Sequence, residues 1–367
     1  MKARLIGSLS LFLMLGASLD LHAQSWRYTG DMTTERASQS ATLLTNGEVL
    51  VAGGRQRGNF QLVTAELYNP TTGTFSSTGS LNTGRNSHTA TLLKNGEVLI
   101  AGGTDEVNSQ LTCLASAELY NPSTGEFTVT GSMSTTRCNA TATLLDNGMV
   151  LVAGGYNTSI TVLSSAELYN PSTGTFTLTG SLNTARAGQT ANLLSNGAVL
   201  IAGGGNSTTY FNSAELYNPS TGTFTVTASM NVARTVFTAT RLTSGEVLAV
   251  GGENMTNVWL ASAELYNPST GKWTLTGSLN ESRFYQTATL LNSGDVLIAG
   301  GNHSGSIASC ELYNPSTGTF STTASLNTAR QITPAVQLNS GEVLVPGGYD
   351  GNGGNTGYLA TAELFQQ

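Results

Sequence analysis

Apolar and polar residues alternate in short runs along the chain, and these runs recur with a period of about 49 residues. Each unit opens on an alternating run such as TATLL, passes through a turn such as the Asn-Gly of residues 95–96, and continues as EVLIAGG. Alternation on both sides of Asn-Gly predicts a β-hairpin. The two glycines that end the second run suit a crowded backbone position.

A second pair of strands follows a loop of variable sequence in each unit. The run AELY predicts a third strand, the segment NPSTG carries turn residues, and TFTLTG predicts a threonine-rich outer strand. No helical period follows residue 23. Each unit therefore predicts four antiparallel strands.

Seven such units fill residues 24–367, because the double glycine ends at positions 54, 103, 155, 204, 252, 301 and 348. Seven four-stranded sheets in an open array would expose strand edges, whereas radial closure protects them. We therefore expect one all-β domain, a seven-bladed β-propeller with four antiparallel strands per blade.

The two ends of the repeat region predict how the ring closes. Residues 25–30, SWRYTG, match the fourth strand of a unit, and residues 361–367, TAELFQQ, match the third. The N-terminal strand should therefore complete the last blade. Trp26 would then stand where other blades carry Phe75 or Trp273, and Phe365 would stand for their tyrosine.

The double glycine after the second strand and an aromatic pair seven residues apart resemble the kelch repeat. The six pairs are Tyr68 and Phe75, Tyr120 and Phe127, Tyr169 and Phe176, Tyr217 and Phe224, Tyr266 and Trp273, and Tyr313 and Phe320. The resemblance covers residues 25–367 and implies a kelch-type propeller, with Phe in most places where Trp is usual. It leaves the function open, because such propellers include enzymes, binding proteins and scaffolds.

A glutamate and an arginine recur in every unit of a chain that is otherwise poor in charge. Six pairs lie 19 residues apart, and Arg36 with Glu363 would complete the set across the ring closure; the six are Glu66/Arg85, Glu118/Arg137, Glu167/Arg186, Glu215/Arg234, Glu264/Arg283 and Glu311/Arg330. We interpret them as structural ion pairs, in which each arginine forks onto a neighbouring third strand and locks adjacent blades. The alternative is a ring of seven arginines that faces the channel and attracts an anion. Repetition in all blades favours the structural interpretation.

The charge composition limits the kinds of partner that the chain can bind. Charged residues make up 10% of the chain, the net charge is −7, and no basic run is present to neutralise phosphates, so we expect no nucleic-acid partner. Three cysteines leave the pairing open. Cys113 and Cys138 flank one unit and could form a disulfide, whereas Cys310 replaces an alanine of the other units and suits a buried position.

Residues 1–23 resemble a secretory signal peptide, with Lys2 and Arg4 before an apolar run and a cleavage point after Ala23. We therefore expect a secreted or periplasmic protein. The mature chain contains no further apolar span, and we expect a monomer.

Candidate ligand-binding residues lie where the units differ. One variable segment is the triplet after each arginine, and the other is the loop after each double glycine; both belong to the end of the propeller opposite the Asn-Gly turns. The triplets supply His88, Gln189, Phe237, Tyr285 and Gln286, and the loops supply Tyr156, Tyr210, Trp259, His303, Tyr349 and Asp350.

Aromatic rings interleaved with amides suit a sugar or a polar peptide. We therefore predict a non-catalytic binding or scaffold module for a carbohydrate or protein ligand, without a cofactor or metal. The alternative is a sugar-modifying enzyme. A galactose-oxidase-like copper site needs two His, two Tyr and a Cys, and the mature chain has His88 and His303 in different units. An epimerase-like site could use Glu253, Asp350 and His88.

Overall fold

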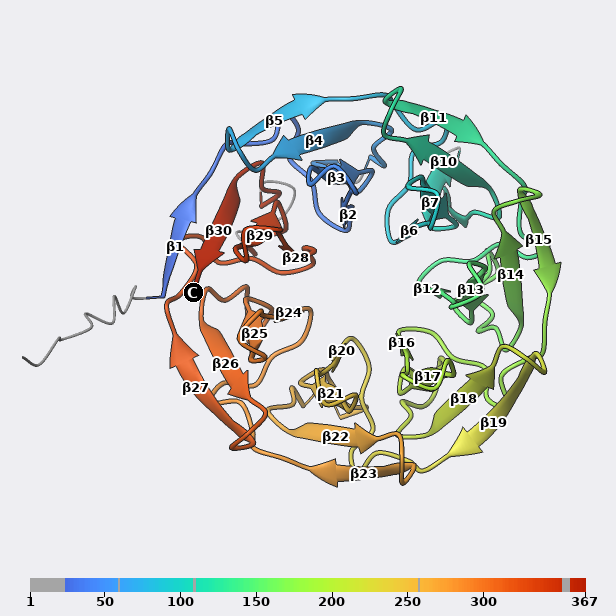
Figure 1. Cartoon of the computed structure of the whole chain (residues 1–367), viewed down its shortest axis with the longest axis vertical. Helices are drawn as coiled ribbons and strands as arrows, with labels where there is room; N and C mark the ends of the chain where they lie inside the picture. The colour runs from blue at the N-terminus through green and yellow to red at the C-terminus, as the bar shows by residue number, and fades with distance from the viewer. Residues whose placement is uncertain (1–23, 59, 108–109, 257, 352–356) are drawn as a thin grey trace, which may run out of the picture.

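The computed structural model describes residues 24–58, 60–107, 110–256, 258–351 and 357–367. Seven four-stranded antiparallel sheets stand around one axis (Figure 1), and the described residues include no helix. The predicted all-β, seven-bladed propeller is confirmed. The signal-peptide prediction for residues 1–23 lies outside the described residues. No described helix is long and apolar enough to cross a bilayer.

The strands occupy four concentric layers. Nearest the axis are β2 (Ser40–Leu43), β6 (Thr89–Leu92), β12 (Thr141–Leu144), β16 (Thr190–Leu193), β20 (Thr238–Arg241), β24 (Thr287–Leu290) and β28 (Val336–Gln337). The second layer contains β3 (Val49–Ala52), β7 (Val98–Ala101), β13 (Val150–Ala153), β17 (Val199–Ala202), β21 (Val247–Val250), β25 (Val296–Ala299) and β29 (Val343–Pro346).

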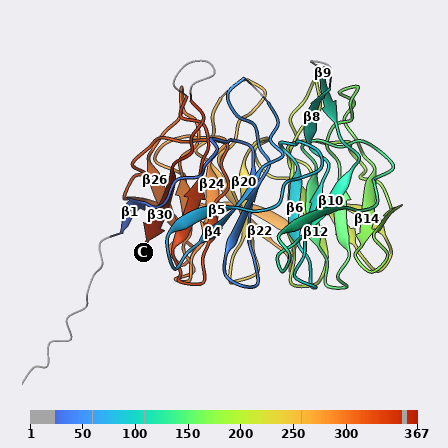
Figure 2. The same cartoon turned by 90° about the horizontal axis from the view of Figure 1, so that it is seen from above.

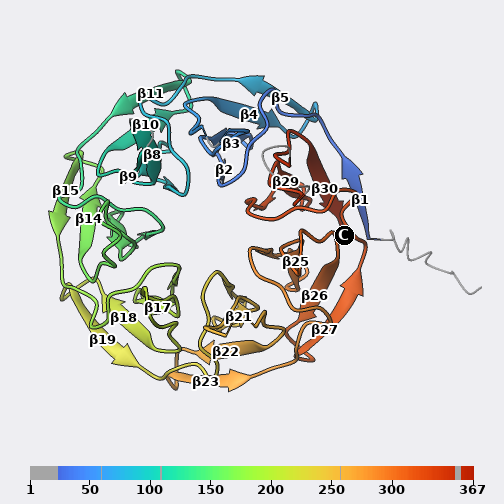
Figure 3. The ribbon, with the colours of Figure 1, turned by 180° about the vertical axis from the view of Figure 1, so that it is seen from behind.

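The third layer contains β4 (Ala65–Asn69), β10 (Ala117–Asn121), β14 (Ala166–Asn170), β18 (Ala214–Asn218), β22 (Ala263–Asn267), β26 (Cys310–Asn314) and β30 (Ala362–Gln366). The outer layer contains β5 (Thr74–Ser77), β11 (Glu126–Val129), β15 (Thr175–Leu178), β19 (Thr223–Thr227), β23 (Lys272–Leu275), β27 (Thr319–Thr323) and β1 (Ser25–Tyr28). We number the blades 1 to 7 in the order of their innermost strands. A further hairpin of β8 (Thr104–Val107) and β9 (Gln110–Cys113) rises from blade 2 (Figures 2 and 3), where the sequence predicted a loop.

The N-terminal strand completes the last blade, as predicted. The sheet order is β1-β30-β29-β28, and Trp26 lies opposite Phe365 with ring centroids 5.2 Å apart. The Trp26 indole also donates a hydrogen bond to the Ala324 carbonyl of blade 6 at 3.0 Å. The closing strand is therefore held by blade 7, which it completes, and by blade 6.

The hydrophobic core lies between blades. Leu50 and Ala52 of blade 1 pack with Val98, Ile100 and Tyr120 of blade 2, and similar clusters fill the other interfaces. Every second-layer strand is fully buried, which explains its unbroken apolar sequence. Because each blade covers one face of the next, the core runs around the ring.

Buried aromatic residues link each blade to the one before it. In all seven blades the third-strand aromatic residue pairs with an outer-strand ring, at 4.8–5.2 Å between centroids. In six blades the tyrosine hydroxyl also bonds a threonine at the end of the outer strand of the preceding blade, as Tyr120 bonds Thr78 at 2.9 Å. The repeated Tyr and Thr therefore connect the blades along their outer edges.

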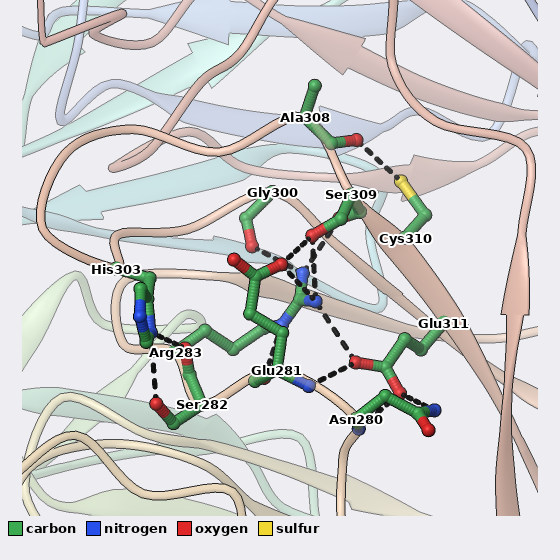
Figure 4. Close-up of polar contacts among 10 residues, drawn as sticks. All are labelled: Asn280, Glu281, Ser282, Arg283, Gly300, His303, Ala308, Ser309, Cys310 and Glu311. Atoms are coloured by element: carbon green, nitrogen blue, oxygen red, sulfur yellow. Dashed lines mark hydrogen bonds and ion pairs between the residues drawn. The ribbon is translucent and has the colours of Figure 1, made fainter.

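Each repeated arginine spans two blades. The main chain of Arg85 is held by blade 1, because its N–H donates to the Leu62 carbonyl and its own carbonyl accepts from Gly54. Its guanidinium reaches into blade 2, where Nη1 donates to the Gly102 carbonyl at 2.8 Å and Nη2 donates to Glu118 at 2.8 Å. Figure 4 shows the equivalent contacts of Arg283.

Seven such ion pairs form the ring, at 2.7–3.1 Å between Nη2 and Oε1, and both side chains of each pair are at most 1% exposed: Arg36–Glu66, Arg85–Glu118, Arg137–Glu167, Arg186–Glu215, Arg234–Glu264, Arg283–Glu311 and Arg330–Glu363. Each arginine thus pairs with the glutamate of the blade it enters. The sequence-based pairing of Arg36 with Glu363, and of the six pairs 19 residues apart, is wrong. The bidentate fork is also wrong, because Nη1 binds main-chain carbonyls. The buried arginines exclude the alternative of a channel-facing ring.

The double glycine makes room for the arginine main chain. A Cβ on Gly102 would lie 2.4 Å from the carbonyl oxygen of Arg137, and Gly103 donates its N–H to that same oxygen. Both glycines have positive φ, at 65° and 92°. A side chain on Gly102 would therefore displace the main chain of Arg137, and one on Gly103 would collide with Asn86 and His88 in its own blade.

Cys113 and Cys138 form a disulfide between β9 of blade 2 and the triplet after Arg137. Cys310 is free and buried, and burial raises the pKa of its thiol to about 11.

Removing one member of a buried ion pair should destabilise the propeller strongly. We expect Glu215→Leu to lower the free energy of unfolding by about 3–5 kcal/mol, because it leaves the Arg186 charge buried and uncompensated. Arg27→Leu, which breaks an exposed pair with Glu342, is the control and should cost under about 1 kcal/mol. Urea denaturation measures both, and similar costs would contradict the role given to the buried pairs.

Thiol titration tests the cysteine assignment. The native protein should show no reactive thiol, because Cys310 is buried and its pKa is raised. The denatured protein should show one thiol without reductant and three after reduction. Three thiols in the denatured, unreduced protein would contradict the disulfide.

Candidate functional site

The two variable segments of each unit lie side by side at one end of the ring. An isolated bridge joins the first triplet residue to the loop after the double glycine in every blade, as in Ala37 with Arg55 and Cys138 with Tyr156. Figure 2 shows loops extending at the end of the ring that carries β8 and β9. The prediction that both segments share one end is therefore confirmed.

A cavity of about 590 Å³ opens where these segments surround the axis. Triplet residues from all seven blades line it, but the loops that line it come from blades 3, 4 and 5: Tyr156, Gly205, Asn206, Tyr210 and Glu253. We call this cavity the channel mouth. Its wall therefore departs from the sevenfold repeat on one side, as a site for a single ligand requires.

The middle residue of each triplet shapes the rim of the channel mouth. All seven have φ between 46° and 65°, yet one of them alone is glycine: Ser38, Ser87, Asn139, Gly188, Val236, Tyr285 and Ile332. Such backbone is costly for branched and aromatic side chains. Main-chain bonds hold it around part of the ring: Ser87 to Ser38, Ser38 to Ile332, Ile332 to Tyr285, and Tyr285 to Val236, at 3.1–3.3 Å.

The third triplet residue packs against the preceding blade. Gln189 donates its amide N–H to the Ala153 carbonyl at 3.0 Å, and Gln286 donates to Val250 at 2.9 Å. Both glutamines line the channel mouth, are 6% exposed, and leave Oε1 buried without a partner among the described residues. Their donors therefore hold blades together, and Gln39 does the same through Pro346.

His88 occupies the equivalent place in blade 2. Its Nε2 lies 2.9 Å from the Ser40 hydroxyl, and burial together with the charge of Arg85 lowers the pKa of His88 to about 3. The imidazole is therefore neutral at physiological pH. Phe237 fills the same place in blade 5, where the guanidinium of Arg234 lies 5.9 Å from its ring centroid.

The side formed by blades 3 to 6 combines three tyrosines with one carboxylate. Tyr210 donates its hydroxyl to Glu253 at 3.3 Å, and Tyr156 and Tyr285 line the same wall. Burial and the nearby charge of Glu253 raise the pKa of Tyr210 and of Tyr285. Among the described lining residues, Glu253 is the single carboxylate, and no Lys or Arg joins it.

Four candidate residues do not line the channel mouth: Trp259, His303, Tyr349 and Asp350. Trp259 stacks on Phe284 at 6.3 Å and contacts His303 at 5.0 Å. Tyr349 packs edge-on against Tyr358 at 5.4 Å. Trp259, His303 and Tyr349 therefore pack within the loops next to the cavity. The channel mouth is lined instead by four residues that the sequence reasoning did not select: Asn139, Asn206, Val236 and Ile332. All except Asn206 are the middle residue of their triplet, and that shared position could have identified them.

Ser282 and His303 resemble a nucleophile and base, at 3.0 Å between Oγ and Nδ1 (Figure 4). However, the same Nδ1 lies 2.9 Å from the Ser282 carbonyl oxygen, which can only accept a hydrogen bond. Nδ1 therefore carries the proton and cannot take one from the serine. No group of three or more His, Cys, Asp or Glu that could hold a metal occurs in the described part of the chain.

Two family models of kelch repeats match the sequence, in agreement with the propeller fold. The model of the KLHDC2/KLHL20/DRC7 Kelch-repeats domain matches residues 39–252, more than half of the chain, and the Kelch motif model matches residues 235–280. The chain belongs to the kelch-repeat family. A search of curated proteins finds no match to its sequence.

Solved structures share the kelch propeller fold. A fungal alcohol oxidase of the AA5 family, in complex with copper, superposes with a TM-score of 0.75 and 16% identity, over 94% of this chain and 76% of the oxidase. YjhT superposes with a TM-score of 0.64 and 13% identity, over 80% of this chain and 98% of YjhT. At these identities the likeness establishes the fold alone.

Relieving backbone strain at the rim should not weaken the protein. We expect Val236→Gly to raise the free energy of unfolding by about 1 kcal/mol, because glycine tolerates the φ of 46° that valine does not. The control Val226→Gly, in the exposed outer strand β19, should lower it by about 1 kcal/mol. Thermal or urea unfolding compares them, and equal losses would contradict the strain.

Proposed function

We propose that this kelch propeller is a non-catalytic binding module whose ligand is a carbohydrate held at the channel mouth. The observation that carries the proposal is the one-sided wall of a 590 Å³ cavity, where Tyr156, Tyr210 and Tyr285 stand beside Asn139 and Asn206. Aromatic faces cover the apolar side of a sugar ring, and amides bond its hydroxyls. The volume suits a ligand of a few hundred cubic ångströms.

The polar groups of the wall support binding rather than turnover. Acid–base chemistry on a sugar uses two groups that exchange protons, commonly a pair of carboxylates. Glu253 is the single carboxylate among the described lining residues, and His88 is neutral and bonded to Ser40. Asp350, which the enzyme alternative would need, does not line the cavity.

The copper of the fungal oxidase does not fit the residues of this chain. A copper site of the galactose-oxidase type needs two imidazoles and a cysteine beside its tyrosines. Here His88 bonds Ser40, His303 bonds Ser282, and Cys113 and Cys138 are joined to each other. Cys310 is buried with a raised pKa. We therefore assign no redox step to the channel mouth.

Export is part of the proposal. The disulfide between Cys113 and Cys138 is typical of oxidising compartments, which agrees with the signal-like sequence of residues 1–23.

A glycan array tests the proposal directly. We expect labelled protein to bind a subset of glycans, and Tyr285→Ala and Tyr210→Ala to lose these signals, because both rings line the cavity. The control Tyr28→Ala changes an exposed tyrosine on the outer strand β1 and should bind as the wild type does.

NMR spectra of a bound glycan incubated with the protein should remain unchanged over hours. If the protein binds no glycan on the array, or if Tyr285→Ala still binds the same glycans, the carbohydrate site is overturned. Conversion of the glycan would overturn the non-catalytic assignment.

A further inference from the structure

The charge of the channel mouth is unbalanced. Glu253 lines its wall, and neither a described lysine nor a described arginine does. The described residues form no ion pair with Glu253, and the Tyr210 hydroxyl, at 3.3 Å, is the one donor that reaches its side chain. A partly buried carboxylate with one weak donor favours a cationic partner, because a charged hydrogen bond is stronger than a neutral one.

The buried carboxylates of the fold show the contrast. Glu215 accepts hydrogen bonds from the main chain of Asn183 and Thr184 and from the Asn183 amide, as well as from Arg186. Its charge is fully compensated by the protein. Glu253 lies outside that ring, in the loop after the double glycine of blade 5, and has no such set of donors.

Three tyrosines line the same cavity as Glu253. Tyr156, Tyr210 and Tyr285 come from three different blades and line the same wall. Tyr210 bonds Glu253 directly, and burial together with the charge of Glu253 raises the pKa of Tyr285. Ring faces attract ammonium groups, and a carboxylate among several aromatic rings is a common arrangement for binding amines.

One cationic side chain lies nearby but does not neutralise the site. The charge of Arg55 acts to lower the pKa of Tyr285, yet Arg55 is not among the described residues that line the cavity. The carboxylate therefore stays available to a ligand.

We infer that the ligand of the channel mouth carries a protonated amine, which Glu253 and the three tyrosines bind, and that within the proposed carbohydrate function the ligand is an amino sugar. The sugar hydroxyls would then bond the amide groups of Asn139 and Asn206 on the same wall. The assignment of the ligand as a sugar rests on the proposed function, whereas the assignment of its protonated amine does not.

Calorimetric or NMR titration with three probes separates the two parts. Glucosamine carries a protonated amine at mildly acidic pH, N-acetylglucosamine has the same ring without the charge, and methylammonium has the charge without the ring. We expect the wild type to bind glucosamine on the order of tenfold more tightly than N-acetylglucosamine.

Glu253→Gln should remove this preference while leaving the affinity for N-acetylglucosamine unchanged. The control Glu97→Gln, which changes a glutamate bonded to Asn95 in a turn at the opposite end of the ring, should keep the preference. The comparison of charged and acetylated sugar in the wild type needs no variant, so the inference is tested even if Glu253→Gln folds poorly.

Each outcome decides something different. Equal affinity for the two sugars overturns the amine site and leaves the carbohydrate function standing. Binding of methylammonium, lost in Glu253→Gln, without binding of either sugar supports the amine site and overturns the carbohydrate function. No binding of any probe overturns both.

Discussion

The fold depends on arginines whose main chain belongs to one blade and whose guanidinium belongs to the next. Each guanidinium satisfies two main-chain carbonyls and a buried glutamate, as Arg186 does with Gly203, Ser213 and Glu215. Isolated buried charges are costly, but a buried pair whose Nη and Oε atoms are hydrogen-bonded specifies one arrangement of its neighbours. With charged residues at only 10% of the chain, seven arginines and seven glutamates are committed to this one contact.

The same contact positions the candidate site. The arginine main chain packs onto the double glycine, and the triplet that follows turns at the rim with positive φ. Seven equivalent turns would give a symmetric opening. The loops of blades 3 to 5 break that symmetry by placing Tyr156, Tyr210 and Glu253 on one side. The constant part of the repeat therefore builds the rim, and the variable part gives it one chemically distinct wall.

Much of the fold follows from the sequence, because period, strand pattern and ring closure are properties of spacing. The ion-pair partners do not follow from the sequence. Glu66 has an arginine on each side along the chain, Arg36 and Arg85, and the blade geometry determines that it pairs with Arg36. Positive φ at the rim is equally hidden, since Gly188 is the one glycine among the seven. Trp259 and His303 are residue types expected at a ligand-binding site, yet they pack against each other beside the cavity. Whether a loop side chain enters the cavity depends on the conformation of the loop, which the repeat pattern does not reveal.

The central claim is that the arginine and the glutamate act as one unit that holds neighbouring blades. A double-mutant cycle on Arg186 and Glu215, followed by urea denaturation, measures their coupling. We expect the double variant Arg186→Met, Glu215→Leu to lose about 2 kcal/mol or more less stability than the two single variants lose together. Additive losses would contradict it, since the two side chains would then stabilise the ring independently.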